Sequence, residues 1–204
     1  MERIYPSYKG KIERNDKQAR DNPSAFAESL NTEYQKARKS KSKVMQRLDK
    51  LPVRIYGSGD YIFEHYEFMK DLDFKFYIIS KSLTEKHRHS HISKLLKLDL
   101  LTTICLSFDL GNLSNYYNLK QLFGTDRLKF TFTGSADEFN ALKKTGHNFD
   151  IFFNTSNKKV EKEKSRLIKE QCPCDSGAME HVKSCSKCNK CWRSSITKGK
   201  EWNI

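Results

Sequence analysis

The stretch FKFYIIS, residues 74–80, is an almost unbroken run of apolar and aromatic side chains. A second run, TICLSF at residues 103–108, has the same character. Near-continuous apolar runs of this length are typical of parallel β-strands that are covered on both faces. These two stretches therefore predict an α/β fold.

Five such runs occur after Pro52, each followed by a helical pattern. The predicted strands are Val53–Tyr56, Phe74–Ser80, Thr102–Phe108, Leu128–Thr133 and Phe149–Asn154. Their centres lie roughly 20 to 30 residues apart, which is the repeat of a strand–helix unit. The sequence thus predicts a partial (β/α) barrel or an open parallel sheet of about five to six strands.

The chain divides into three predicted parts. Residues 1–50 form a polar N-terminal segment and a basic helix, which is expected to begin at Ser24 as its cap. Residues 51–170 form the β/α repeat core, and residues 171–204 form a small cysteine-rich metal-binding lobe. A length of 204 residues suits one domain with an appendage of this kind.

The overall charge is strongly positive, with a formal net charge of +13 and a pI near 9.4. Such a chain attracts polyanions, so nucleic acid is a candidate partner. The basic run at residues 36–43 is either a phosphate-binding face or a solvated one. Because the sequence contains neither a spanning apolar segment nor an apolar leader, we expect no membrane contact and a cytoplasmic location.

Small polar residues close every predicted strand. The endings are Gly57-Ser58-Gly59-Asp60, Ser80-Lys81-Ser82, Ser107-Phe108-Asp109, Thr133-Gly134-Ser135 and Asn154-Thr155-Ser156. Ligands of parallel α/β folds bind at the carboxyl ends of the strands, although these residue types are also common caps and turns. The two glycines of the first ending permit close backbone approach to a ligand. The predicted cofactor-binding residues are Gly57, Ser58, Gly59, Asp60, Lys81 and Asp109.

Five of the six cysteines lie in CPCDSGAMEHVKSCSKCNKCW, residues 172–192. In a reducing compartment, clustered cysteines bind metal more often than they form disulfides. The spacing Cys185-x-x-Cys188-x-x-Cys191 places three thiolates in one tight turn, and Cys172 is the natural fourth ligand. Three close cysteines and one remote cysteine are typical of a four-iron [4Fe-4S] cluster.

Zinc is the alternative metal for this segment. Cys172 and Cys174, paired with Cys185 and Cys188, would satisfy a tetrahedral zinc site. His181 is a substitute ligand in either case. The spacing alone leaves iron–sulfur and zinc both open.

Cys105 and a cluster of three histidines are also residue types that can bind metals, but neither is expected to do so here. Cys105 lies inside an apolar strand and is expected to be a small buried hydrophobe. The histidines His87, His89 and His91 are expected to lie in a solvated loop or at a helix start, with the loop favoured.

Several of these pieces together resemble the phage "gene product 88" domain family. They are RIYGSGD at 54–60, KFY at 75–77 with Ser80-Lys81-Ser82, the pair Cys172-Pro173, and SCSKCNKCW at 184–192. Their order and spacing agree over roughly two-thirds of the chain. The alanine usual after the family's Cys-Pro pair is Cys174 here, which implies that Cys174 is not a core ligand.

The resemblance implies a relative of the radical S-adenosylmethionine enzymes, which have partial (β/α) barrels. In those enzymes a glycine-rich strand ending contacts the amino group of the cofactor, and residues 57–60 would hold that position here. Members of the family carry further cysteines upstream, whereas this sequence has none before Cys105. The resemblance therefore implies either a radical enzyme of a bacteriophage, acting in the bacterial cytoplasm, or a degenerate relative of one.

Overall fold

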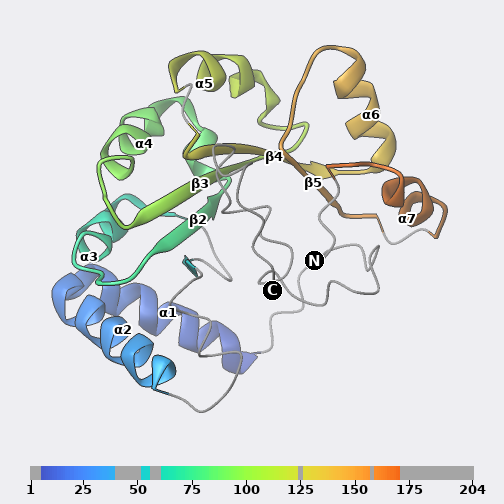
Figure 1. Ribbon diagram of the computed structural model, residues 1–204. Coiled ribbons are helices and arrows are strands. Elements are labelled where there is room, and N and C mark those ends of the chain that lie inside the picture. The colour runs from blue at the N-terminus through green and yellow to red at the C-terminus, as the bar shows by residue number, and fades with distance from the viewer. Residues whose placement is uncertain (1–5, 40–51, 56–60, 124–125, 157–158, 171–204) are drawn as a thin grey trace.

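Five parallel strands form one curled sheet in the computed structural model of the protein (Figure 1). The structure describes residues 6–39, 52–55, 61–123, 126–156 and 159–170. The strands are β1 (Val53–Ile55), β2 (Phe76–Ser80), β3 (Leu101–Phe108), β4 (Leu128–Gly134) and β5 (Ile151–Asn154). Their spatial order follows the chain, and all four neighbouring pairs are parallel. The predicted α/β class and the five strands are confirmed, and the sheet is a half-barrel.

Helices cover the convex face of the sheet, each placed between two consecutive strands (Figure 1). They are α3 (Tyr66–Met69), α4 (His89–Leu95), α5 (Tyr116–Leu122) and α6 (Ala136–Lys144). Short 3₁₀ turns precede three of them: η2 (Phe63–His65), η3 (Ser82–Thr84), η4 (Lys86–Arg88) and η5 (Leu113–Asn115). Helix α7 (Lys159–Arg166) follows β5.

The strands are buried on both faces, as the apolar runs predicted. On the convex face, side chains such as Phe76, Phe108 and Phe132 are fully buried in the main core under the helices. On the other face, Tyr77, Cys105 and Ile151 form a smaller buried cluster. Cys105 is a free, buried thiol, so its prediction as a small hydrophobe is confirmed.

The N-terminal part differs from the prediction. Two helices are present, α1 (Pro6–Asp21) and α2 (Pro23–Arg38), where residues 1–23 were expected to be a polar segment with turns. Helix α2 begins at Pro23 and is capped by Asn22, whose side chain accepts a hydrogen bond from Ala25 N at 3.2 Å. The expectation that Ser24 is the cap is therefore wrong.

Helix α1 was not predicted because tertiary contacts, rather than an apolar pattern in its sequence, hold it in place. Its composition is strongly polar, and isolated helices of this length are marginal in water. Ala19 is nonetheless 2% exposed, and Asp16 bonds to His65 Nε2 at 3.0 Å. A small buried residue and a carboxylate are thus among the contacts that hold the helix in place.

Helix α2 packs against the half-barrel through aromatic side chains. Phe26 meets Phe68 edge to face at 5.1 Å between ring centroids, and Tyr34 stacks on Phe74 at 4.5 Å. The predicted continuation of this helix to residue 50 lies outside the described residues, as does the whole cysteine-rich lobe. Within the described part of the chain, no helix is long and apolar enough to cross a membrane.

Candidate functional site

The carboxyl ends of the five strands lie at one edge of the half-barrel because all the strands run in the same direction. Two predicted site residues fall at adjacent endings, Lys81 after β2 and Asp109 after β3. The structure brings them together, since Lys81 Nζ donates a hydrogen bond to Asp109 Oδ2 in an ion pair. The other predicted ligand contacts, residues 57–60, and the predicted metal ligands, Cys172, Cys185, Cys188 and Cys191, lie outside the described residues, as do Cys174 and His181.

Asp109 is held in its charged form. The hydrogen bond from Lys81 is the main cause that lowers the pKa of Asp109, and backbone N–H groups of Gly111 and Asn112 add to it. Asp109 Oδ1 accepts from Gly111 N at 2.9 Å. The side chains of Lys81 and Asp109 remain 56% and 37% exposed, so the pair faces solvent. A charged donor and a charged acceptor therefore stand side by side at this edge.

Asn112 supports the pair and was missed by sequence reasoning. Its Oδ1 accepts from Asp109 N at 2.7 Å, while its Nδ2 donates to Thr84 Oγ1 at 2.7 Å and to Ser107 O at 3.0 Å. It therefore ties the loop after β2 to the loop after β3. The available signal was the Asp-x-x-Asn spacing directly after a strand, which is typical of a turn closed by side-chain hydrogen bonds.

The serines after β2 form hydrogen bonds with backbone groups. Ser80, which is 1% exposed, accepts from Leu83 N at 3.2 Å, and its hydroxyl lies 3.2 Å from that of Ser82. Ser82 donates to the carbonyl of Tyr61 at 2.7 Å. These bonds fix the chain that follows β1 against the end of β2, which positions the backbone immediately after residues 57–60.

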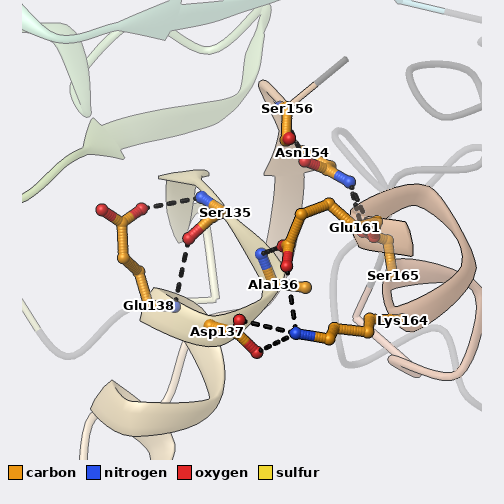
Figure 2. Close-up of polar contacts among 9 residues, drawn as sticks. All are labelled: Ser135, Ala136, Asp137, Glu138, Asn154, Ser156, Glu161, Lys164 and Ser165. Carbon is orange, nitrogen blue, oxygen red and sulfur yellow. Dashed lines mark hydrogen bonds and ion pairs between the residues drawn. The ribbon is translucent and has the colours of Figure 1, made fainter. Parts of the chain in front are cut away.

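At the end of β4, the polar residues are committed to capping a helix (Figure 2). Ser135 Oγ accepts from Glu138 N at 3.3 Å, and Glu138 Oε2 accepts from Ser135 N at 2.7 Å, which together form a capping box. The cap interpretation of Ser135, weighed against ligand binding, is the one that the structure supports.

The residues after β5 anchor the last described helix (Figure 2). Asn154 Oδ1 accepts from Ser156 N at 2.8 Å, and its amide nitrogen donates to Glu161 O at 3.3 Å and to Ser165 Oγ. Glu161 Oε2 in turn accepts from Ala136 N, at the start of α6, at 3.0 Å. The polar residues Ser135, Asn154 and Ser156 at these two endings are therefore used in capping and in docking α7.

The histidines lie at a helix start, one of the two places predicted for them, but two of the three are less solvated than expected. Only His87 is well exposed, at 72%, whereas His89 and His91 lie in the first turn of α4 and are partly buried. Nε2 of His89 and Nδ1 of His91 are buried without a hydrogen-bond partner. Among the described residues, no group of three or more histidine, cysteine or acidic side chains is arranged to hold a metal ion.

Comparisons of the chain with protein-family models, with curated proteins and with solved structures found no match. The resemblance to the gene product 88 family therefore stays a prediction, and the function has to be argued from the half-barrel and its strand ends.

Proposed function

We propose that the half-barrel binds a small ligand, S-adenosylmethionine or another compound with an amino acid group, at the carboxyl ends of its strands. In the same proposal, Cys172, Cys185, Cys188 and Cys191 hold an iron–sulfur cluster or a zinc ion beside that edge. The observation that carries the proposal is the half-barrel of five parallel strands in consecutive order. Barrels of parallel strands bind their ligands at the carboxyl ends, where the connecting loops supply the contacts.

The Lys81–Asp109 pair gives this edge a suitable chemistry. An amino acid group carries a carboxylate and an ammonium, and each can pair with one member of the exposed ion pair. An exposed ion pair contributes little to stability, so exchanging it for bonds to a zwitterionic ligand costs little. Gly57, Ser58, Gly59 and Asp60, on the neighbouring β1 ending, are proposed to supply backbone and carboxylate contacts to the same ligand.

The proposed metal centre is supported by cysteine spacing. Thiolates two residues apart converge on one metal, and both a four-iron cluster and tetrahedral zinc accept four of them. An iron–sulfur cluster would supply electron transfer, which favours an enzyme related to the radical S-adenosylmethionine proteins. A bound zinc ion would instead give the cysteine-rich segment a structural role.

Metal content after anaerobic purification tests the centre. For a cluster, we expect iron and sulfide with a broad visible charge-transfer band that is lost in Cys188→Ala and in Cys191→Ala. The matched control is Cys174→Ala, which should retain the band. If zinc is bound by Cys172, Cys174, Cys185 and Cys188 instead, the metal should be lost in Cys174→Ala. It should then be retained in Cys191→Ala. A folded protein that holds neither metal contradicts this part of the proposal.

Ligand titration of the same sample tests the strand-end site. We expect S-adenosylmethionine to bind at one site per chain and to bind at least about tenfold more weakly in Lys81→Met and in Asp109→Asn, since each variant loses a charge-assisted bond. The matched control is Asp137→Asn, because Asp137 also pairs with a lysine, Lys164, but at the far end of the sheet edge. Equal affinity in all three variants would overturn the assignment of Lys81 and Asp109.

Nucleic-acid binding is a second candidate, and the net charge of +13 favours it. A basic chain of this kind should bind single- or double-stranded nucleic acid with an affinity that falls steeply with salt. We expect a log–log slope of several units when the salt concentration is varied in a polarisation assay. A flat salt dependence would remove this candidate.

A further inference from the structure

A pocket outside the strand-end site contains groups that neither proposed function uses. It has a volume of about 510 Å³ and is lined by Asp16, Arg20, Ile62, Phe63, Glu64, His87, Arg88 and His91. These residues come from α1, from η2 and the residue before it, from η4, and from the first turn of α4. The volume falls within the roughly 300–1,000 Å³ that is usual for small-molecule sites.

Two guanidinium groups face this pocket from different elements. Arg20 is oriented by Asp16, whose Oδ2 accepts from Arg20 Nη2 at 2.7 Å. The bonds of Arg88 are long: Nη1 donates to the Tyr61 carbonyl, and Nε lies near both Glu85 Oε2 and His87 Nε2, all at 3.3 Å. Guanidinium groups with donors to spare are the usual ligands of phosphate, because their planar geometry matches two of its oxygens.

The aromatic ring of Phe63 lines the same pocket. Phe63 is 46% exposed although it is a large apolar side chain, and its ring packs on that of His91 with centroids 4.4 Å apart. The Lys94 ammonium lies 5.0 Å from the Phe63 ring centroid. An exposed ring beside cationic groups is the arrangement on which nucleic-acid bases stack.

His91 also lines the pocket, and its Nδ1 atom is buried. This atom has no hydrogen-bond partner, and leaving a buried polar atom unpaired is costly. Burial is the main cause that lowers the pKa of His91, with the charges of Lys94 and Arg88 adding to it. The ring is therefore mostly neutral near pH 7, so it adds no positive charge to the two arginines.

We propose that this pocket binds a nucleotide unit, with the phosphate on Arg20 and Arg88 and the base against Phe63. The carboxylates of Asp16 and Glu64 balance the two arginines, and they are suited to accept hydrogen bonds from ribose hydroxyls or from a base amino group. That balance disfavours a highly charged ligand such as a triphosphate, so the matching ligand is a nucleoside monophosphate or one nucleotide of a single strand. The residues involved differ from Lys81 and Asp109, and the inference does not depend on the metal centre.

The test measures binding of adenosine monophosphate, adenosine, inorganic phosphate and a short single-stranded DNA to the full chain. We expect the monophosphate to bind one per chain and more tightly than adenosine or phosphate alone. Arg20→Gln and Arg88→Gln should each weaken binding about tenfold or more, and Phe63→Leu should weaken it while keeping an apolar contact to His91. Thermal melts of each variant establish that it is folded, and Arg88→Lys should restore part of the affinity.

The matched control is Lys70→Gln, which also removes one exposed cation from an ion pair, here with Glu67. It should bind as the unchanged protein does. If the single strand binds and the free monophosphate does not, with the same pattern among the variants, the nucleotide unit belongs to a strand. Equal binding of phosphate and monophosphate, no effect of Phe63→Leu, or no binding of any probe would overturn the proposal.

Discussion

At the residue scale, the charged pair at the strand ends stands on two loops that the side chains of Asn112 and Thr84 join. Lys81 and Asp109 stand directly after apolar runs, and the rule that parallel strands end at a common edge brings them together. Asn112 and Thr84 contribute through a bond between two loops that are 28 residues apart in sequence. No local pattern encodes such a long-range partner, so this part of the site required the structure.

Gly134, the last residue of β4, illustrates a packing requirement at a single residue. A Cβ atom built on it would lie 2.6 Å from Glu138 Oε2 and 2.7 Å from the Phe132 ring. We expect Gly134→Ala to lower the free energy of unfolding by about 1–3 kcal/mol, because either the capping carboxylate or the buried ring must move. Urea unfolding measures the change.

Gly111→Ala is the matched control for that substitution. Its Cβ would meet a single atom, Asp109 Oδ1, at 3.2 Å, and that atom belongs to a side chain at the surface. The loss of stability should therefore be smaller than for Gly134→Ala. An equal loss in the two variants would show that close packing at Gly134 is not what matters.

At the scale of elements, strands were easier to predict than polar helices. The five strands carry apolar runs that local composition makes visible, and all five were found within a few residues of their predicted bounds. Helix α7, with the sequence KVEKEKSR, shows the opposite case. Side-chain contacts with β5 and α6 hold it, and these contacts depend on residues far away in sequence (Figure 2).

Glu161 is the residue of α7 on which that docking depends. Its carboxylate, 13% exposed, binds Ala136 N and the Lys164 ammonium. We expect Glu161→Ala to speed hydrogen exchange across 159–166 by roughly tenfold or more, since a charge-assisted bond to a helix N-terminus is lost. Glu163→Ala, which changes an exposed glutamate of the same helix, should leave the exchange rates nearly unaltered. Equal rates in both variants would mean that other contacts hold α7.

At the scale of the whole molecule, His65 joins the N-terminal helices to the half-barrel. Its ring is 7% exposed and bonds to Asp16 of α1. Burial is the main cause that lowers the pKa of His65, and the nearby Arg20 acts in the same direction, while Asp16 and Glu64 oppose them. The folded protein thus keeps this histidine neutral at a pH where the unfolded chain binds a proton.

Stability should therefore fall as the pH drops below about 6.5, the ordinary pKa of histidine, because the unfolded state takes up more protons than the folded state. Urea midpoints between pH 7.5 and 5.5 measure this decline. We expect a shallower decline in His65→Gln, whereas His87→Gln, which alters an exposed histidine, should follow the unchanged protein. Parallel curves for all three proteins would remove His65 as a cause.

The consecutive order of the strands has a consequence for how the chain is made. Paired residues of neighbouring strands are separated by only roughly 20 to 26 positions, so every strand emerges from the ribosome when its partner has just been synthesised. The sheet can grow by one strand–helix unit at a time, from β1 towards β5, without waiting for a distant segment. Pausing translation once three or more of these units have left the ribosome should leave a nascent chain whose emerged strands are already paired.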